Sequence, residues 1–354
     1  MRKFAVFSGF LGSGKTSTMM ALTQYYTEHH GKAAMISNDL GGQGLADHRL
    51  AKLQGCNASE ITGECICFCH EALLERLNSF YDAGCELVVS DIPGFGVGAL
   101  EHVYHGMEAD YPGQLELAPF TVLVEPQTVD LLRERRGDDM AHILHAQLLE
   151  ADLIVLNKCD LLTGEDKAGA IAWLSAAYPQ ARVIGISAIK EDGLEELSQA
   201  LIQGKASMRH PAINYEDTDL QHAMGELSEY YLQYRAEVCC NDFDGNAYLL
   251  DLAERIQADI KRAGWEIPHL KLLAWEPEGD YGKVDLLGTD RPVETFHSFT
   301  RPCKDLAVVL NTTAVCPDRK LEEILLAAVK EISKQYQLEV MIFQTEWLGL
   351  GEEE

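Results

Sequence analysis

The chain has 354 residues, 47% of them hydrophobic, and a formal net charge of −27. This length predicts two domains, and the composition is typical of a globular protein rather than a disordered one. Because an acidic surface repels polyanions, the charge disfavours nucleic acid as the main partner and suits a cationic ligand or a basic protein. Ten cysteines without a secretion signal predict a reducing, cytoplasmic location. No apolar stretch approaches the ~20 residues that cross a membrane.

Residues 1–204 alternate short apolar runs with longer amphipathic segments. The apolar runs predict buried strands: KFAVFSG, KAAMISND, CELVVSDIPG, FTVLVEP, DLIVLNK and RVIGISA. Helices are predicted between them, at about 15–29, 69–83, 127–150, 165–177 and 192–203. We therefore expect an α/β domain over residues 1–204 with a doubly wound, mostly parallel sheet.

A smaller domain is predicted over residues 218–354, after a linker at 205–217. The linker, KASMRHPAINYED, has no hydrophobic period and contains a proline. The pattern that follows predicts helices at 218–236, 245–263 and 318–335, and strands in HLKLLAWE, GKVDLLG, DLAVVLNTTA and LEVMIFQTEWL. This order indicates an α+β domain whose antiparallel sheet is covered by helices on one face.

The segment GFLGSGKT at residues 9–16 matches the phosphate-binding pattern G-x-x-x-x-G-K-[ST]. It follows a predicted strand and opens a predicted helix, where glycine lets backbone N–H groups wrap phosphates at the helix N-terminus. Lys15 is predicted to reach the terminal phosphates and Thr16 to coordinate Mg²⁺. The candidate phosphate-binding residues are Gly9, Gly12, Ser13, Gly14, Lys15, Thr16 and Ser17.

A second motif, Asn157-Lys158-Cys159-Asp160, follows an apolar strand, at the sheet edge where open α/β sheets bind ligands. It resembles the guanine-recognition motif N-K-x-D of P-loop GTPases, in which the aspartate accepts hydrogen bonds from the guanine base. Ser187 and Ala188, after the next strand, resemble the third base-contacting loop of that class. The expected ligands are therefore GTP and its product GDP.

A third motif, Asp91-Ile92-Pro93-Gly94, ends another buried strand and resembles the D-x-x-G element of GTPases. Asp91 is predicted to bind Mg²⁺, and the Gly94 N–H to sense the γ-phosphate. The alternative is a strand that simply ends in a Pro-Gly turn. Lys15, Thr16 and Asp91 are thus the predicted catalytic residues. No water-positioning glutamine or internal arginine finger is evident, so we expect slow hydrolysis that a metal or a partner stimulates.

Three cysteines occupy alternate positions in GECICFCH, residues 63–70. A straight strand separates such residues by ~6.6 Å and cannot gather them around one ion, whereas a turn leading into a helix can. A position at a helix N-terminus also favours the thiolate form of Cys69. The alternative is three buried thiols. The predicted site binds a thiophilic ion, Zn²⁺ or Co²⁺, through Cys65, Cys67 and Cys69, with Glu64 or His70 as a weaker fourth ligand.

These segments occur in the order typical of the CobW-type GTPases, relatives of the HypB and UreG nickel-insertion GTPases, and the chain resembles that family over residues 1 to about 204. The resemblance implies that the segment Asn38-Asp39-Leu40-Gly41 is a nucleotide-sensing switch near the metal site, with Asp39 in contact with the nucleotide. The chain departs from the family's usual C-x-C-C pattern, because Phe68 stands at the third cysteine. We therefore expect a divergent member.

Three functions follow from these motifs. The resemblance implies GTP hydrolysis coupled to delivery of a metal ion to a client metalloprotein. An alternative is an accessory GTPase that assembles or activates a corrinoid protein in methyl-transfer systems, and another is a nucleotide-dependent binding module whose cysteines are purely structural. A homodimer is expected by analogy only.

Overall fold

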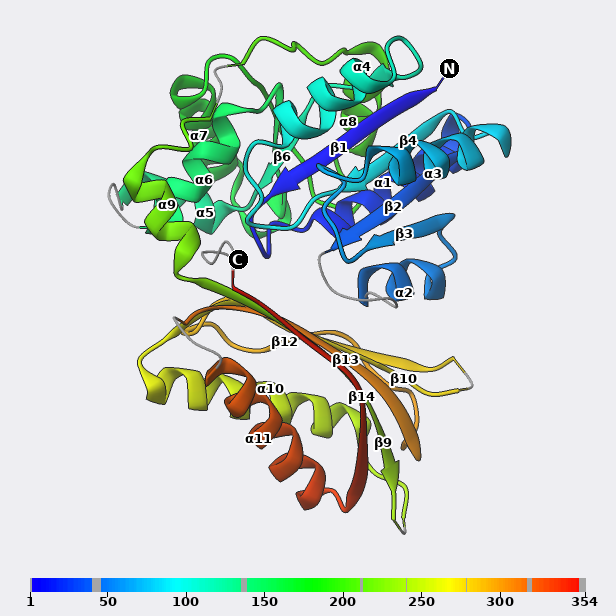
Figure 1. Ribbon diagram of the computed structural model, residues 1–354, viewed down its shortest axis with the longest axis vertical. Coiled ribbons are helices and arrows are strands. Elements are labelled where there is room, and N and C mark those ends of the chain that lie inside the picture. The colour runs from blue at the N-terminus through cyan, green and yellow to red at the C-terminus, as the bar shows by residue number, and fades with distance from the viewer. Residues whose placement is uncertain are drawn as a thin grey trace. The chain divides into compact units, whose positions relative to one another are not determined.

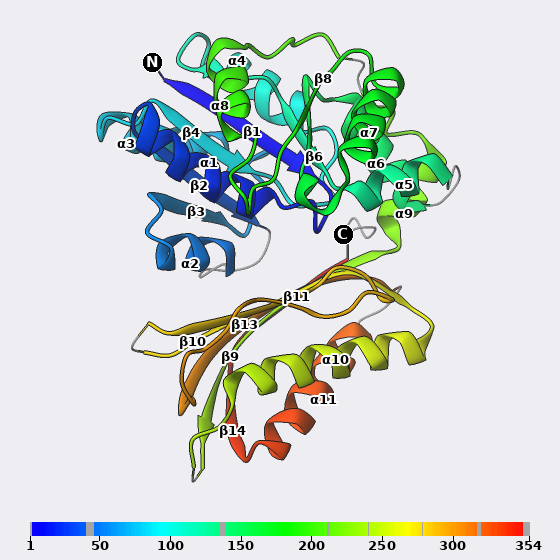
Figure 2. The same ribbon diagram turned by 180° about the vertical axis from the view of Figure 1, so that it is seen from behind.

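The computed structural model describes residues 2–39, 46–134, 139–210, 213–239, 241–277, 279–316 and 320–349. The chain divides into two compact units, Met1–Gln43 with Asp47–Gln221, and Gly44–Ala46 with His222–Glu354. Each unit has its own sheet (Figures 1 and 2). Within the described ranges, no helix has the length and apolar character needed to cross a bilayer.

The first unit is built on an eight-stranded sheet with the order β3-β2-β4-β1-β6-β7-β8, and the short β5 (Glu116–Leu117) also pairs with β1. Every pairing is parallel. All residues of the central strands β1 and β4 are buried, which explains why these runs are apolar throughout. The strands of the main path are β1 (Lys3–Gly9), β2 (Ala33–Asp39), β3 (Ala58–Thr62), β4 (Leu87–Asp91), β6 (Thr121–Val124), β7 (Leu153–Leu156) and β8 (Arg182–Gly185).

Helices cover both faces of this sheet, as the two opposite views show (Figures 1 and 2). The predicted helix at 127–150 is two helices, α5 and α6. The strand β3 and helix α2 were not predicted, because both are short, with five and eight residues, and so give little length over which a hydrophobic period can be read. The α-helices of this unit are α1 (Lys15–His29), α2 (Ala46–Leu53), α3 (His70–Asp82), α4 (Gly106–Asp110), α5 (Pro126–Glu134), α6 (Asp139–Leu149), α7 (Gly164–Ala177) and α8 (Leu194–Gln203), and the division between the two units falls within α9 (Thr218–Gly225). The predicted α/β fold is confirmed.

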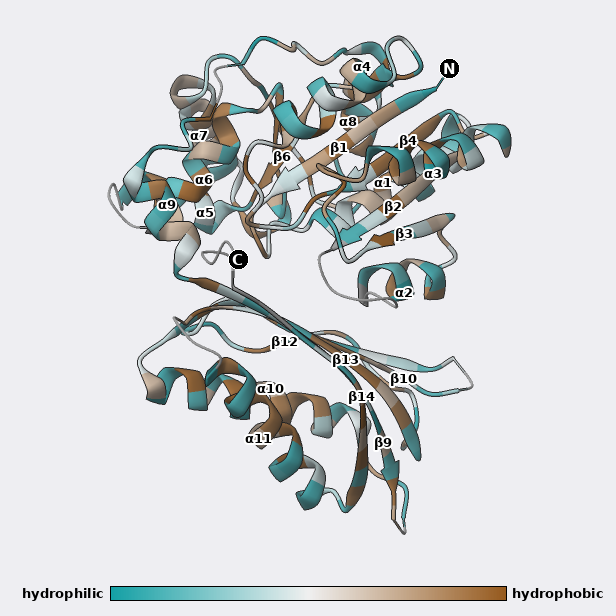
Figure 3. Ribbon diagram, in the orientation of Figure 1, coloured by the Kyte–Doolittle hydropathy of each residue, from teal (hydrophilic) through white to brown (hydrophobic). Residues whose placement is uncertain are grey.

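The second unit is a six-stranded antiparallel sheet with the order β12-β11-β10-β13-β9-β14. Helices α10 (Gly245–Ala263) and α11 (Lys320–Gln335) lie together on one of its faces (Figure 2). Both helices carry hydrophobic and hydrophilic residues (Figure 3), and their apolar residues enter the core with those of the strands. The strands are β9 (Leu227–Val238), β10 (Glu266–Trp275), β11 (Tyr281–Leu286), β12 (Glu294–His297), β13 (Asp305–Val315) and β14 (Leu338–Gly349). The predicted α+β architecture is confirmed.

One predicted element of this unit is wrong. The helix expected over residues 218–236 ends at Gly225, and the rest of that segment belongs to strand β9. Apolar residues alternate along β9, so that Tyr230, Leu232 and Tyr234 all enter the core on one face. This period of two, with aromatic residues that favour strands, outweighs the polar residues between them.

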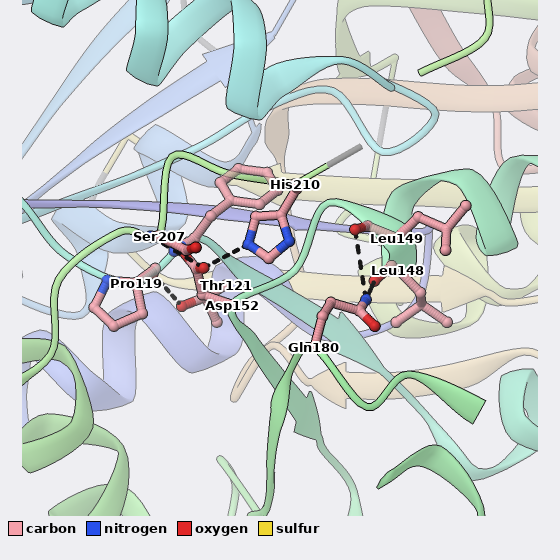
Figure 4. A network of polar contacts seen from close by, with 9 residues as sticks. Pro119, Thr121, Leu148, Leu149, Asp152, Gln180, Ser207 and His210 are labelled. Atoms are coloured by element: carbon pink, nitrogen blue, oxygen red, sulfur yellow. Dashed lines mark hydrogen bonds and ion pairs between the residues drawn. The ribbon is translucent and has the colours of Figure 1, made fainter. Parts of the chain in front are cut away.

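The chain that leaves α8 is anchored to the first unit by one buried carboxylate (Figure 4). Asp152 accepts hydrogen bonds from the backbone N–H of Phe120 at 2.9 Å and of Ser207 at 3.1 Å, and its Oδ1 lies 2.5 Å from His210 Nε2. The His210 side chain is only 5% exposed. Phe120 and Asp152 directly precede β6 and β7, so this contact lies at the amino ends of the strands, opposite to the edge that carries the predicted site.

Candidate functional site

The phosphate-loop motif lies where β1 leaves the sheet. Gly9, Gly12 and Gly14 have positive φ angles of 129°, 80° and 89°, which glycine adopts with little strain. A Cβ at Gly14 would collide with the Asn157 side-chain amide, and one at Gly9 would collide with the Leu123 carbonyl oxygen. Glycine is therefore required at both positions by conformation and by space.

The polar side chains of the loop are arranged for a charged ligand. Lys15 Nζ donates to the Gly9 carbonyl oxygen at 2.6 Å, so its ammonium group lies across the loop. Ser13 is buried, and its hydroxyl has no hydrogen-bond partner in the part of the chain that the structure describes. A buried hydroxyl without a partner is costly unless a ligand satisfies it. The residues present thus fit a bound phosphate chain.

Thr16 and Asp47 form a contact that the sequence analysis did not single out. Thr16 Oγ1 donates to Asp47 Oδ2 at 2.7 Å, and Asp47 lies in the first turn of α2. Hydroxyl and carboxylate oxygens are the ligands that Mg²⁺ takes beside nucleotide phosphates. The only signal in the sequence was an acid placed directly after the glycine-rich segment NDLGGQGLA.

Asp91 ends β4 beside β1 and is 4% exposed. Its Oδ1 accepts a hydrogen bond from the Asn38 backbone N–H at 2.9 Å. The turn that follows is held by Gln147 of α6, whose Nε2 donates to the carbonyl oxygens of Gly94 and Gly96 at 3.1 and 3.0 Å. The predicted D-x-x-G turn is therefore held in place by the buried side-chain amide of Gln147.

A buried carboxylate supports the next residues of the same segment. Glu150 accepts hydrogen bonds from the Gly98 N–H at 2.9 Å and the Leu100 N–H at 3.1 Å. Burial raises the pKa of Glu150 to about 7, although these hydrogen bonds act in the opposite direction. Leu100 opens a π-helical segment, Leu100–His105, a rare geometry that often occurs near functional sites.

The predicted base-recognition residues come together through Asn157, which is 2% exposed. Its Nδ2 donates to the Ser13 carbonyl oxygen at 3.0 Å, and its Oδ1 accepts from the Ala188 N–H at 3.1 Å. One amide therefore joins the phosphate loop to the loop after β8.

The other two polar residues of the motif have side-chain partners. Asp160 is exposed, and its Oδ1 accepts a hydrogen bond from Ser187 Oγ at 2.5 Å. Lys158 Nζ lies 2.6 Å from Glu125 Oε2.

The cysteine segment is a turn, as predicted, and not a strand. The Phe68 N–H donates to the Cys65 carbonyl oxygen at 2.9 Å, and α3 begins two residues later. Cys65 Sγ and Cys67 Sγ lie 2.7 Å apart, whereas Cys69 Sγ faces the Cys65 carbonyl oxygen at 3.4 Å. Within the described residues, no three His, Cys, Asp or Glu side chains are grouped as metal ligands. The turn thus gathers two of the three predicted thiols.

The thiols differ in their electrostatic surroundings. The hydrogen bond between Cys65 and Cys67 lowers the pKa of Cys65 and, together with burial, raises the pKa of Cys67. Burial raises the pKa of Cys69 to about 11, and the nearby Glu64 carboxylate acts in the same direction. The predicted preference of Cys69 for the thiolate form is therefore wrong, because burial outweighs the helix N-terminus.

One of the two proposed fourth ligands, His70, is held by other partners. His70 Nδ1 lies 2.7 Å from Asp110 Oδ2, and its Nε2 lies 2.7 Å from the His102 carbonyl oxygen. Both partners are acceptors, so His70 uses both ring nitrogens to tie the start of α3 to the segment around α4. Glu64, the other proposed fourth ligand, is exposed, and its carboxylate acts to raise the pKa of both Cys65 and Cys69, while the Asn38 side chain binds only the Glu64 backbone carbonyl oxygen.

Asn38 connects the cysteine turn to the nucleotide motifs. Its Nδ2 donates to the carbonyl oxygens of Ile61 and Glu64 at 3.2 and 2.9 Å, and its Oδ1 accepts from the Ile66 N–H at 3.0 Å. Because its backbone N–H binds Asp91, this one residue, 4% exposed, touches both motifs. The Asp39 side chain, Leu40 and Gly41, which complete the predicted switch, lie outside the described residues.

The parallel sheet, the glycine-rich loop at its central strand and the predicted base-recognition loops at the same edge define a P-loop nucleotide-binding protein. The model of the CobW/HypB/UreG nucleotide-binding domain matches residues 3–184. The chain therefore belongs to the CobW/HypB/UreG family, and the resemblance expected from its motifs is confirmed.

Individual relatives are distant. The zinc chaperone YeiR of Escherichia coli K12 is 27% identical over 177 residues, a match that covers 49% of this chain and 51% of that protein, about half of its length. Nickel-bound HypB from Helicobacter pylori has a TM-score of 0.41 and 17% identity over 57% of this chain and 86% of its own. The Zn(II)-bound YjiA GTPase from E. coli has a TM-score of 0.35 and 16% identity over 93% and 98%.

Proposed function

We propose that this protein binds GTP with Mg²⁺, hydrolyses the GTP slowly to GDP, and couples the nucleotide state to the handling of a thiophilic divalent ion, as a metallochaperone does. The observation that carries the proposal is the position of Asn38, which binds Asp91 with its backbone and the cysteine turn with its side chain. A change at the nucleotide motif has a direct route to the thiols through this residue.

In this proposal each nucleotide motif has one role. Backbone N–H groups of the phosphate loop bind the phosphates, and the Lys15 ammonium leaves the Gly9 carbonyl oxygen to neutralise the terminal ones. The Thr16 hydroxyl and the Asp91 carboxylate would hold Mg²⁺, and the Asp47 carboxylate, which accepts a hydrogen bond from the Thr16 hydroxyl, is a further candidate ligand. Bound Mg²⁺ supplies positive charge to the β and γ phosphates. Asp160 selects guanine, and Asn157 keeps the base loop in register with the phosphate loop.

The metal cargo, Zn²⁺ or Co²⁺, is proposed to bind Cys65 and Cys67. Two thiolates on one tetrahedral ion lie ~3.8 Å apart when each bond is ~2.3 Å long, so the sulfurs have to separate from their 2.7 Å contact by about 1 Å. Two protein thiolates leave two positions of the ion for other ligands. An incompletely coordinated ion is suited to transfer, because a client metalloprotein can bind it before the donor lets go. The relative named a zinc chaperone is consistent with such a cargo.

The experiment is a titration of the purified protein with Co²⁺, followed through the thiolate-to-cobalt charge-transfer band, in the presence of GTP and of GDP. We expect a band in the native protein, its loss in Cys65→Ser/Cys67→Ser, and different affinities in the two nucleotide states. Cys239→Ser is the matched control, since this thiol is exposed and belongs to the second unit. An unchanged band in the double variant would remove the metal site, and equal competition by ATP would remove the assignment to GTP.

A further inference from the structure

Three aromatic side chains form an exposed row beside the cysteine turn. Phe68 is 68% exposed and stands between Cys67 and Cys69. Its ring centroid lies 5.6 Å from that of His102, which lies 6.0 Å from that of Tyr215, itself 41% exposed. We refer to Phe68, His102 and Tyr215 as the aromatic patch. Exposed rings that lie together offer a surface that a partner can cover, which removes their apolar area from water.

The patch is held in place by its backbone and by one hydrogen bond. His102 Nε2 lies 3.1 Å from the Tyr215 hydroxyl, and His102 belongs to the π-helical segment Leu100–His105. A Cβ at Gly98 would collide with the same hydroxyl, so the small residue there lets Tyr215 approach. The rings are therefore presented in a fixed arrangement, which lowers the entropic cost of binding a partner.

The edge of the patch is acidic. Glu64 and Glu101 are both exposed, and they directly precede Cys65 and His102 in the chain. Burial and, after it, the nearby acidic groups Glu150, Glu101 and Cys67 raise the pKa of the Tyr215 hydroxyl to about 12. Glu101 is thus an acidic group close enough to act on Tyr215. An aromatic surface with an acidic rim favours a cationic group, because the ring faces and the carboxylates both attract it.

We infer that the aromatic patch is the docking surface for the protein that receives the metal ion, and that the docked segment is basic, with an arginine or lysine side chain against the rings. This inference rests on the proposed function. Phe68 is the direct neighbour of both Cys67 and Cys69 in the chain, so a segment that covers Phe68 brings the acceptor's own ligands to the ion. A receiving protein has to reach the thiols, and this patch is the hydrophobic surface next to them.

The probes are two synthetic zinc-finger peptides that carry the same two cysteines and two histidines, one flanked by arginines and the other by glutamates. Cobalt is loaded on the native protein, and its transfer to each peptide is followed by stopped-flow absorbance at low and high salt. We expect transfer to the arginine-flanked peptide to be at least about 10-fold faster at low salt, as a cation-π contact and charge attraction predict. In Phe68→Ser this advantage falls to about 2-fold or less, while the cobalt band itself remains.

Phe343→Ser is the matched control, because Phe343 is 57% exposed on strand β14 in the second unit. It should keep the full advantage of the arginine-flanked peptide. Equal rates for the two peptides, or a Phe68→Ser variant that behaves like the native protein, would overturn the docking surface. A native dimer that dissociates in Phe68→Ser, as judged by sedimentation equilibrium, would also overturn it by assigning the patch to a second copy of the chain.

A separate binding assay without metal distinguishes a failure of the docking surface from a failure of the proposed function. Peptides with serine in place of cysteine cannot bind metal, and their affinity for the metal-free protein is measured by fluorescence anisotropy. Tighter binding of the arginine-flanked peptide, lost in Phe68→Ser, supports the docking surface even when the native protein gives no cobalt band and the metal function fails. No preference in this assay overturns the docking surface even when the cobalt band is present.

Discussion

The phosphate loop and the cysteine turn lie at the same edge of one sheet but are held in different ways. The phosphate loop depends on conformations that only glycine adopts easily, and its neighbour Asn157 binds two loops at once. The cysteine turn has its own hydrogen bond between Phe68 and Cys65, but it is also held by Asn38, which is distant in sequence, and by His70, which binds distant partners. A local motif can therefore specify the first site, whereas long-range contacts specify the second.

The largest expected effect breaks the phosphate loop. Lys15→Ala removes the ammonium group that offsets the terminal phosphates, so we expect GTP affinity to fall at least about 100-fold, as calorimetry would measure. Lys32→Ala is the control, because Lys32 is an exposed lysine of the same unit that donates to the Ala83 carbonyl oxygen. GTP binding at native strength in Lys15→Ala would contradict the assignment of this loop.

A smaller effect on GTP affinity is expected when the residue predicted to recognise the guanine base is changed. Asp160→Asn should weaken GTP by roughly 10- to 100-fold and improve xanthosine triphosphate, because the amide can donate to the oxygen that replaces the guanine amino group. Competition between the two nucleotides in a filter-binding assay measures both changes. Asp166→Asn, on the exposed first turn of α7, is the control and should keep the native preference for GTP.

The buried Glu150 carboxylate, which binds the backbone after the D-x-x-G motif, predicts that the free energy of unfolding depends on pH. The pKa of Glu150 is raised from 4.5 to about 7 in the folded protein, so the folded state keeps a proton that the unfolded chain releases in this window. The free energy of unfolding contributed by this group should therefore fall as pH rises from 4.5 to 7, by up to about 3 kcal/mol. Urea denaturation at pH 5 and pH 7.5 measures it.

Glu150→Gln should remove this part of the pH dependence, because the amide does not titrate. Its hydrogen bonds to Gly98 and Leu100 are only partly replaced, so the variant is also expected to be less stable near pH 5. Glu75→Gln, on the exposed face of α3, should retain the native slope. A native slope in Glu150→Gln would show that the buried carboxylate does not control it.

The smallest expected effect tests the connection between the two sites. Asn38→Asp keeps the acceptor for the Ile66 N–H but places a carboxylate oxygen against the carbonyl oxygens of Ile61 and Glu64. We expect the ratio of Co²⁺ affinities in the GTP and GDP states to approach one, a change of about 5-fold, with GTP affinity within about 3-fold of native. Asn57→Asp, an amide that contacts Cys85, is the control. An unchanged ratio would assign the coupling to other residues.

The sequence predicts most of the first unit because buried parallel strands are apolar throughout and the loop motifs have fixed spacing. Prediction from the sequence fails where the structure depends on contacts between residues that are far apart in the chain. His70 was a candidate ligand until its ring nitrogens were found at Asp110 and His102, and Asp47 was overlooked because its partner Thr16 lies 31 positions away. The error at β9 has another cause, since its strand period is mixed with charged residues that also suit a helix.

The hydrogen bonds that Asn38 and His70 make at the cysteine turn affect how tightly a metal ion can bind there. Asn38 fixes Glu64 and Ile66, the two neighbours of Cys65, and His70 fixes the start of α3 directly after Cys69. Only a few residues remain between these points. Ordering a free backbone residue costs about 1–2 kcal/mol in conformational entropy, so a turn that folding has already ordered can bind an ion with little further loss of freedom. The affinity of this turn for metal therefore depends partly on the stability of the fold. Variants that remove the hydrogen bonds of Asn38 or of His70 should bind the ion more weakly, although every thiol ligand is still present.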